Sequence, residues 1–251
     1  MSKIKISAAL IVRNESANIP DAIKSLAFAD QIVVADTGSS DDTVDIARNL
    51  GAEVHSVTFE GFGKTKNKAL DYCRGDWVLF IDADERVTPE LAEKILTAAD
   101  NESSSSGFLI NRLTYFLGKP VRHSGWYPDY ILRFFKREKG RFSSSLVHEW
   151  VNVDGPVDKL EGLLLHYSYN SLDQYLDKLN EYSSLSARDM FEKGKKFNIL
   201  DLLFRPILTF LKMFVFKAGF LDGLNAFTLA VLSSYHVFIK YVKLYQLRKK
   251  R

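Results

Sequence analysis

Three carboxylates, Asp82, Asp84 and Glu85, lie within four positions at the end of the apolar stretch WVLFIDADE. Two carboxylates spaced by one residue can share a divalent cation, or one can bind a cation while the other binds a sugar hydroxyl. Mg²⁺ and Mn²⁺ prefer hard oxygen ligands, and Mg²⁺ commonly uses one or two carboxylates together with substrate phosphates. The pattern therefore favours a site for a divalent cation and a diphosphate.

Two other interpretations of this cluster fit less well. An acidic helix cap is possible, because Asp and Glu are favoured near helix N-termini, but it accounts for only one of the carboxylates. Phosphatases of the haloacid-dehalogenase type also place Asp-x-Asp after an apolar strand, and their motif has Thr or Val two residues beyond the second Asp. This chain has Arg86 there, and its Asp-x-Asp follows the fourth expected strand rather than the first.

A second candidate lies in VVADTGSSDDT, where an expected strand ends at Asp36 and Gly38 begins a tight turn. Turn chemistry alone explains such residues. An Asp at a strand end can also accept a hydrogen bond from a nucleobase imide, as found in uridine. Together with the Asp-x-Asp downstream, Asp36 indicates a nucleotide pocket.

Alternating strand and helix patterns position these residues. The expected strands are ISAALIVRNE, QIVVAD, AEVHSVTF and DWVLFIDADE. Helical spacing of apolar residues is found in NIPDAIKSLAFA, TVDIARNLG, GFGKTKNKALDYC and TPELAEKILTAA. This alternation implies an α/β fold with a mainly parallel sheet flanked by helices, whose ligands bind beyond the carboxyl ends of the strands. Because Asn14, Glu15, Asp36, Asp82 and Asp84 fall at those ends, we expect them to converge on one crevice.

The rest of the chain has a different pattern. A polar loop, DNESSSSG, precedes short expected strands up to about His166, and helices follow. We expect a catalytic domain over residues 1–170, with a nucleotide-sugar-binding half (1–100) and an acceptor-binding half (101–170). Residues 171–251 form an apolar helical region.

The motifs ALIVRNE, VVADTGSSDDT, KNKAL and VLFIDADE resemble, in order and spacing, the nucleotide-binding half of family-2 inverting glycosyltransferases of the GT-A fold. Within that family the layout is similar to bacterial lipopolysaccharide core glucosyltransferases that act on an inner-core heptose. The narrower similarity rests on GWYPDYILRFFKR, SLVHE, LLHYSYNSLDQYLDKLNEYS and the apolar tail. The resemblance implies a GT-A, Rossmann-like sheet with an apolar helical C-terminal extension.

The resemblance also implies roles for single residues. Asp36 matches the family's uracil-contacting Asp, Asp82 the Asp that touches the ribose, and Asp84 the Asp that binds the metal bridging the diphosphate. Lys66 occupies a position where the family often has Arg before Asn, so it is expected to neutralise phosphate charge. Two further residues, Asn14 and Glu15, end the first expected strand. They are also expected to line the nucleotide pocket.

Transfer by a single displacement inverts the anomeric carbon and needs one base for the acceptor hydroxyl. The family's later Glu-Asp pair is missing here, and Val147-His148-Glu149 stands in its place. We expect Glu149 to be the base, with His148 as an orienting or acceptor-contacting group; a polar strand edge is the alternative. His166 either completes the metal or phosphate site or is a satisfied buried histidine.

The acceptor is expected to meet GWYPDY, where Trp126 and Tyr127 offer platforms for a sugar face and Asp129 a partner for hydroxyls. Packing in the core is an equal alternative for the two aromatic residues. Arg133 is expected either to bind acceptor anions or to pair with an acid.

Composition narrows the classes further. The net charge is +3, which does not favour nucleic acid as a partner. The single cysteine, Cys73, excludes a disulfide framework and a metal site of several thiolates. The apolar run near the N-terminus is too short for a secretory signal, so we expect the catalytic part in the cytoplasm.

The C-terminal third raises the question of a membrane. Residues 218–239 are long enough to span one but contain Asp222, and charge at membrane depth is costly. Arg205 and Lys212 share one helix face, and Lys240 and Lys243 share another, which is typical of a helix lying in the membrane interface. We expect peripheral attachment to the cytoplasmic face of the inner membrane; a spanning helix, or packing on the catalytic domain or a second copy, are the alternatives.

The motifs and the family resemblance together predict an enzyme that uses Mg²⁺ or Mn²⁺ to move a hexose, with glucose as the first candidate, from a UDP-sugar donor to a lipid-linked saccharide acceptor. Two rivals remain at this point. One is a synthase of polyprenyl-phosphate sugars, in which a phosphate is the nucleophile. The other is a nonenzymatic nucleotide-sugar-binding protein.

Overall fold

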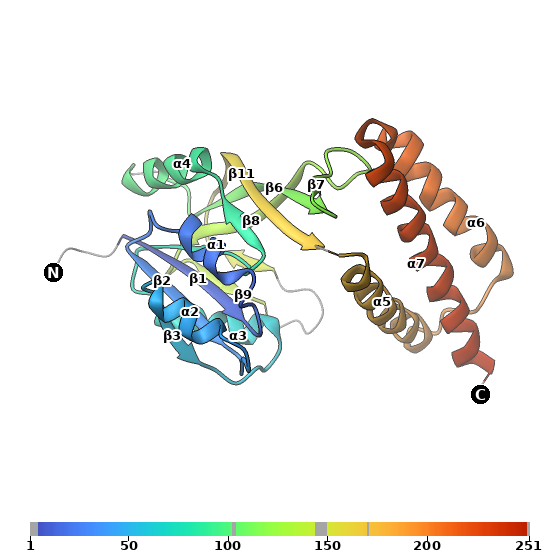
Figure 1. Cartoon of the computed structure of the whole chain (residues 1–251), viewed down its shortest axis with the longest axis horizontal. Coiled ribbons are helices and arrows are strands. Elements are labelled where there is room, and N and C mark those ends of the chain that lie inside the picture. The colour runs from blue at the N-terminus through green and yellow to red at the C-terminus, as the bar shows by residue number, and fades with distance from the viewer. Residues whose placement is uncertain (1–4, 102–103, 144–149, 170, 250–251) are drawn as a thin grey trace. The chain divides into compact units, whose positions relative to one another are not determined.

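The computed structural model describes residues 5–101, 104–143, 150–169 and 171–249 (Figure 1). The chain divides into two units, each held together by its own contacts. Unit 1 comprises Met1–Arg112 and Asp129–His166, and unit 2 comprises Leu113–Pro128 and Tyr167–Arg251. The functional boundaries expected near residues 100 and 170 stay predictions.

The first half of unit 1 is a parallel sheet, as the alternating pattern predicts. Its strands follow the order β3-β2-β1-β4, and every neighbouring pair is parallel. They are β1 (Ile6–Val12), β2 (Gln31–Asp36), β3 (Glu53–Ser56) and β4 (Trp77–Phe80). The helices between and after them are α1 (Ile19–Ser25), α2 (Thr43–Asn49), α3 (Phe62–Tyr72) and α4 (Pro89–Asp100).

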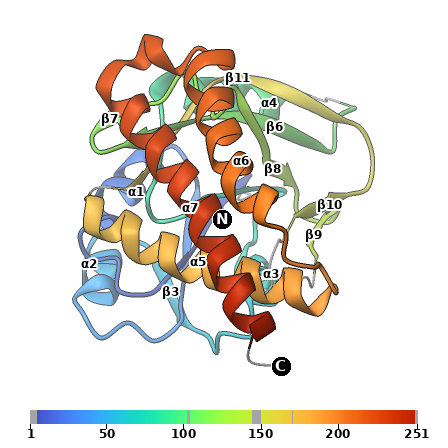
Figure 2. The ribbon, with the colours of Figure 1, turned by 90° about the vertical axis from the view of Figure 1, so that its right-hand side faces the viewer.

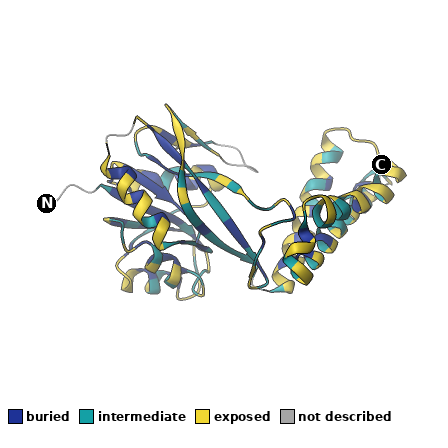
Figure 3. Ribbon diagram, turned by 90° about the horizontal axis from the view of Figure 1, so that it is seen from above, coloured by how far each residue is buried: buried dark blue, intermediate teal, exposed yellow. Residues whose placement is uncertain are grey.

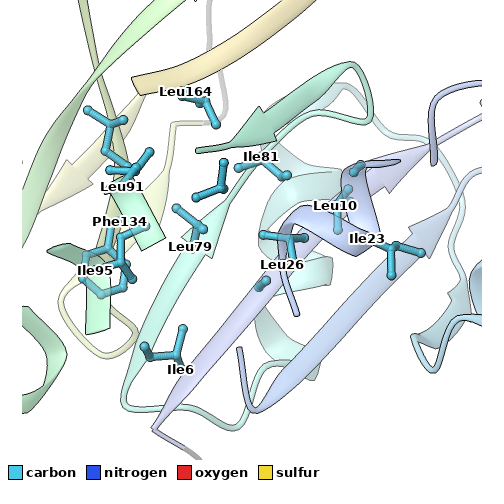
Figure 4. Packing of buried hydrophobic residues seen from close by; sticks show 14 of the residues in the cluster. Ile6, Leu10, Ile23, Leu26, Leu79, Ile81, Leu91, Ile95, Phe134 and Leu164 are labelled. Atoms are coloured by element: carbon cyan, nitrogen blue, oxygen red, sulfur yellow. The ribbon is translucent and has the colours of Figure 1, made fainter. Parts of the chain in front are cut away.

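Side chains of β1 alternate between two apolar layers, because successive residues of a strand point to opposite faces. Ala8 and Leu10 join the layer that contains α1 and α4, whereas Ala9 joins the layer that contains α3. Figure 4 shows the first layer, in which Leu10 and Ile23 lie near Leu26, and Leu91 lies near Phe134. Burial on both faces explains why these strands are almost continuously apolar.

The sheet continues beyond β4 in the order β8-β6-β11-β5, with β7 paired to β6, and the pairs β4-β8, β8-β6, β6-β7 and β11-β5 are antiparallel. They are β5 (Glu85–Val87), β6 (Gly107–Phe116), β7 (Lys119–Pro120), β8 (Asp129–Lys136) and β11 (Val157–Tyr169). A separate pair contains β9 (Gly140–Phe142) and β10 (Val151–Val153). β6 and β11 begin in unit 1 and end in unit 2.

The expected fourth strand, DWVLFIDADE, is in fact two elements. β4 ends at Phe80, and the chain turns so that the Glu85 N–H donates to the Asp82 carbonyl, with a 2.9 Å bond from the Asp82 N–H to Glu85 Oε2. Glu85 then starts β5, which pairs with β11 through Glu85 and His166. The acidic residues are therefore divided between a turn and a strand.

Unit 2 is mainly helical, as expected for the C-terminal region. Its helices are α5 (Leu172–Glu192), α6 (Ile199–Phe210) and α7 (Gly223–Lys249), and α7 contacts both of the others (Figure 2). A π-helical turn, η1 (Leu211–Phe216), and a 3-10 turn, η2 (Gly219–Asp222), join α6 to α7. None of the described helices has the length and apolarity needed to cross a bilayer. The α/β sheet with a helical C-terminal extension is thus confirmed.

Candidate active site

The carboxyl ends of β1, β2 and β4 lie side by side, because β1 pairs in parallel with both neighbours. Asp36 is the last residue of β2, and Asp82 follows β4. Neighbouring strands are about 4.8 Å apart, so the strands that carry Asp36 and Asp82 are separated by roughly 10 Å. Asn14 and Glu15, which follow β1, fall between them in strand order. A nucleoside could extend along such an edge.

The Asp36 carboxylate shapes the turn that follows β2. It is buried and accepts 3.1 Å hydrogen bonds from the N–H groups of Gly38 and Ser39. Gly38 has a φ of +99°, a backbone conformation that residues other than glycine rarely adopt. Each carboxylate oxygen has two lone pairs, so Asp36 keeps acceptor capacity for a further donor. Its contact with uracil stays a prediction.

Asn14 ties the end of β1 to the same turn. Its N–H donates to Ser39 Oγ at 2.9 Å, and its Oδ1 accepts from the Ser40 N–H at 2.7 Å. Asn14 has φ of +54°, which Asn tolerates better than most residues. Glu15 accepts from Asn18 Nδ2 at 2.9 Å. Both residues therefore organise the loops at the edge, and their contacts with a nucleotide stay predictions.

Asp41 caps the start of α2. Its carboxylate accepts from the N–H groups of Thr43, which begins α2, and of Ser16, both at 3.1 Å. The hydrogen bond from the Thr43 hydroxyl is the main cause that lowers the pKa of Asp41 to about 2. The Asp42 side chain makes no capping bond to the helix.

Asp82 lies between two cations that come from other elements. Arg133 Nη2 of β8 is 2.6 Å from Asp82 Oδ2, and Lys66 Nζ of α3 is 3.4 Å from Asp82 Oδ1. The side chains of Lys66 and Arg133 are 4% and 10% exposed, whereas that of Asp82 is 37% exposed. Burial raises the pKa of Asp82, but the charges of Arg133 and Lys66 outweigh it and hold the pKa well below its usual range. Asp82 is therefore ionised at neutral pH.

Glu85 is the buried carboxylate of this cluster. Its carboxylate is fully buried and lies 3.4 Å from Arg133 Nη2 and 3.3 Å from Arg112 Nη1. Arg112 Nη2 in turn lies 2.7 Å from Asp129 Oδ2. A buried carboxylate is tolerated only when it is paired in this way. The three carboxylates, the two arginines and Lys66 thus form one charge-balanced network.

Asp84 lies beside His166, with 3.3 Å between Asp84 Oδ2 and His166 Nε2. Two ligands at right angles around a cation of the Mg²⁺ type would lie about 3 Å apart, since each bond is about 2.1 Å long. The pair therefore fits two neighbouring ligand positions of an octahedral ion. Groups of three or more His, Cys, Asp or Glu suited to a metal do not occur among the described residues. Diphosphate and water would have to supply the other ligands.

Arg86 stabilises the loop that carries Asp82 and Asp84. It is also the residue whose type disfavours the phosphatase interpretation of the sequence. Its Nη1 donates to the carbonyls of Ala83 and Glu85 at 2.7 and 2.9 Å. Its Nη2 donates to the carbonyl of Asn18 at 2.8 Å, which joins the loop to the start of α1. The loop is thereby held from both sides.

The residues predicted to meet the acceptor fall in both units. Asp129 and Arg133 belong to unit 1, and Trp126 and Tyr127 belong to unit 2. Trp126 is half-buried and packs in an apolar cluster, with its ring 6.4 Å from that of Tyr169. Packing thus accounts for part of the Trp126 surface, and the acceptor roles stay predictions. The predicted base, Glu149, and its neighbour His148 lie outside the described residues.

A family model described as glycosyl transferase family 2 matches residues 7–147, which include every strand-end residue described above. The chain belongs to glycosyl transferase family 2. The family and the enzyme class expected from the sequence motifs are therefore confirmed.

Curated relatives resemble this glycosyltransferase over nearly its whole length. An uncharacterized glycosyltransferase of Rickettsia typhi is 33% identical over 98% of this chain and 88% of its own. The lipopolysaccharide core biosynthesis glycosyltransferase LpsC of Rhizobium meliloti is 31% identical over 97% of this chain and 93% of its own. The narrower similarity to lipopolysaccharide core enzymes is thus also confirmed.

A solved structure with partial similarity is glucosyl-3-phosphoglycerate synthase from Mycobacterium tuberculosis in complex with Mn²⁺, UDP and phosphoglyceric acid. It has a TM-score of 0.48 and 21% identity, and the match covers 68% of this chain and 73% of that one. At these values the similarity carries no argument about the site.

Sequence reasoning missed two residues of this glycosyltransferase, Glu85 and Arg112. Glu85 was grouped with the Asp-x-Asp acids as one acidic run, although it is buried and structural. A signal was present, because Glu85 and Val87 alternate with Arg86 as residues on one face of a strand do. Arg112 gave no local signal, since its partners Glu85 and Asp129 are distant in sequence.

Proposed function

We propose that this glycosyltransferase moves a hexose, with glucose as the first candidate, from a UDP-sugar to a lipid-linked saccharide with inversion of the anomeric carbon. The observation that carries the proposal is the edge at which Asp82, flanked by Lys66 and Arg133, adjoins the pair of Asp84 and His166. The name of LpsC, a lipopolysaccharide core biosynthesis glycosyltransferase, supports an acceptor in the lipopolysaccharide core. Within that core, an inner-core heptose is the acceptor that we propose.

In this proposal the donor lies along the carboxyl edge of the parallel strands. Asp36 accepts the uracil imide hydrogen, Asp82 contacts the ribose, and Asn14 and Glu15 line the pocket between them. Lys66 is nearly buried, so its charge is weakly screened and acts strongly on a diphosphate. Its ammonium also lies 5.5 Å from the Phe80 ring and 5.6 Å from the Phe142 ring, which fixes its direction.

A divalent cation, Mg²⁺ or Mn²⁺, fits the pair of Asp84 and His166. When bound, such a cation offsets the charge of the diphosphate and stabilises it as a leaving group. His166 is placed by the pairing of β11 with β5, and Asp84 by the loop that Arg86 braces. Both ligands are thus held by separate parts of the fold.

The transfer step needs a base at the acceptor. The acceptor hydroxyl oxygen attacks the anomeric carbon, the bond from that carbon to the diphosphate oxygen breaks, and the hydroxyl proton goes to Glu149. His148 orients Glu149 or the acceptor, Trp126 and Tyr127 support the sugar face, and Asp129 accepts from its hydroxyls. One base is enough, because a single displacement forms no covalent intermediate with the enzyme.

The proposal places the enzyme peripherally on the cytoplasmic face of the inner membrane. The helices of unit 2 expose many large apolar side chains. Figure 3 colours much of the ribbon of the C-terminal helices yellow, which marks exposed residues. The exposed apolar residues from α6 to the start of α7 are Ile199, Leu200, Leu203, Phe204, Ile207, Leu208, Val215, Phe216, Phe220, Leu221 and Leu224. Lys212 and Lys217 are exposed among them, which suits an anionic lipid surface. Lys243, expected at the same surface, instead donates to Asn180 and Ser183 of α5.

The test is release of UDP from UDP-glucose with Mn²⁺, measured with and without truncated lipopolysaccharide core as acceptor. We expect slow release alone and much faster release with acceptor. Glu149→Gln should lower transfer on the order of 100-fold or more and leave UDP affinity unchanged. Absence of UDP release in every condition would contradict the proposal.

The rival synthase of polyprenyl-phosphate sugars gives the opposite pattern. Its nucleophile is already an anion, so Glu149→Gln should leave its rate nearly unchanged. Turnover with polyprenyl phosphate, and none with lipopolysaccharide core, would favour that rival. No observation in the described residues favours it at present.

A further inference from the structure

Arg133 occupies a β-bulge in the middle of the sheet. In the pairing of β6 with β8, Phe108 lies opposite Phe134 and Leu109 lies opposite Leu132, so Arg133 is the extra residue between them. A bulge interrupts the alternation of side chains and redirects one of them, and bulges are frequent beside active sites. The bulge thus gives Arg133 a direction that regular pairing would not.

The redirected side chain meets the donor part of the site. Arg133 Nη2 lies 2.6 Å from Asp82 Oδ2, and Lys66 Nζ approaches the other oxygen of the same carboxylate at 3.4 Å. Glu85, which is fully buried, lies 3.4 Å from the same Nη2 of Arg133. Two nearly buried cations therefore converge on Asp82, the member of the group that is open to solvent.

We propose that Arg133 binds the diphosphate of the sugar donor, together with Lys66, and stabilises UDP as it departs. This role differs from the acceptor contact that the sequence suggested, and it rests on the proposed use of a nucleoside diphosphate sugar. Before the donor binds, the carboxylates of Asp82 and Glu85 together balance the two cations. The donor's own negative charge then takes over part of that balance.

The chemistry of the step suits a guanidinium. As the bond between the anomeric carbon and the diphosphate oxygen breaks, its electron pair remains on that oxygen, where negative charge grows. Arg133 donates hydrogen bonds to phosphate oxygens and stays protonated throughout, so no proton is transferred to or from it. Its planar fork matches phosphate geometry, and its burial strengthens the attraction. Glu85 acts on this step only by positioning Arg133.

The experiment compares UDP with uridine in isothermal titrations of the full chain with Mn²⁺ present and acceptor absent. Arg133→Gln should weaken UDP binding about tenfold or more, because it removes hydrogen bonds between charged groups. Uridine, which lacks the diphosphate, should bind equally well before and after the substitution. Arg133→Lys should weaken UDP less, because it keeps the charge but loses the fork.

Arg137→Gln is the matched control, since Arg137 lies just beyond β8 and contacts the Gly75 carbonyl and Glu138 rather than Asp82. It should leave both affinities unchanged. Acceptor-independent release of UDP from UDP-glucose should fall on the order of 100-fold in Arg133→Gln and stay constant in the control.

The possible outcomes separate the two proposals. Equal UDP affinities of wild type and Arg133→Gln would overturn the assignment, and a loss of transfer alone would point to the acceptor. A parallel loss of uridine and UDP binding would also overturn it, because that result indicates a distorted pocket. If the wild-type chain binds no UDP at all, the proposed function fails and the role of Arg133 falls with it.

Discussion

The edge of the sheet in unit 1 and the helices of unit 2 depart from ordinary burial in opposite ways. At the edge, charged side chains lie inside, with Glu85 fully buried and Lys66 nearly so. In unit 2, large apolar side chains lie outside, with Phe216 and Leu224 78% and 79% exposed. Charged groups are rarely buried without partners, and large apolar patches are rarely left exposed without a use.

The contrast indicates which kind of binding partner suits each region. Buried cations around a carboxylate favour an anionic ligand with several oxygens, because only such a ligand replaces the lost hydration. Exposed apolar residues beside lysines favour a surface that is apolar within and anionic outside. In the proposed function, the first region carries the chemistry of transfer, and the second would bring a soluble donor to a lipid-linked acceptor.

The largest effect is expected at the proposed metal ligands of unit 1, Asp84 and His166. Asp84→Asn should lower Mn²⁺-dependent release of UDP on the order of 100- to 1,000-fold, because it removes a charged ligand beside the leaving group. Initial rates at saturating UDP-glucose provide the measurement. Asp45→Asn, an exposed change on α2, should leave the rate unchanged. A nonenzymatic binding protein would show altered affinity in Asp84→Asn and no rate to lose.

The buried network should affect stability more than any exposed pair. Glu85→Gln leaves Arg112 and Arg133 with an uncharged partner, and breaking such a buried pair costs about 3–5 kcal/mol. Urea unfolding followed by circular dichroism gives the free energy. Glu161→Gln is the control, since Glu161 pairs with Lys94 at the surface and should contribute less than about 1 kcal/mol. Equal losses of unfolding free energy in both variants would show that the buried pairs of Glu85 stabilise the fold no more than an exposed pair does.

The exposed face of unit 2 gives a smaller effect that sharpens the comparison. Phe216→Ser combined with Leu224→Ser should weaken sedimentation with phosphatidylglycerol vesicles about tenfold or more, because each apolar side chain contributes about 1.5–3 kcal/mol when removed from water. Leu185→Ser, an exposed change on α5, should have little effect. Unchanged vesicle binding together with a shift from dimer to monomer would assign the face to a second copy of the chain.

The smallest effect concerns the turn at the edge. The pKa of Asp41 is lowered from 3.8 to about 2 by its hydrogen bonds, so its contribution to stability is complete above about pH 4 and is lost as the pH falls toward 2. Wild type should therefore lose more unfolding free energy than Asp41→Asn over this range. Acid unfolding curves of the two proteins would show the difference. Parallel curves would mean that Asp41 does not cap α2 in solution.

The parallel half of the fold could be predicted because its signals are local. Apolar strands alternate with helical patterns, and Asp36 and Asp82 follow from where the apolar runs end. The sequence leaves His166 open between a ligand of the metal or phosphate site and a satisfied buried histidine, because His166 comes close to Asp84 only through the pairing of β5 with β11. Local patterns carry no information about which distant strands pair.

Other features of the site depend on register, which the sequence alone does not specify. The bulge that redirects Arg133 exists because β6 and β8 shift by one residue at Phe108. The split between β4 and β5 depends on the turn between Asp82 and Glu85. For this reason the sequence leaves Arg133 open between binding an acceptor anion and pairing with an acid, and the structure shows it paired with Asp82. Tertiary pairing decided both outcomes.

The central claim is that the carboxyl edge of unit 1 binds a uridine diphosphate through a divalent cation. Its most direct test is a set of titrations of the full chain with UDP, ADP and GDP, each with Mn²⁺ and again with EDTA. The account predicts that UDP binds most tightly and that EDTA removes most of its affinity. Tighter binding of ADP or GDP, or UDP binding that EDTA leaves unchanged, would contradict it.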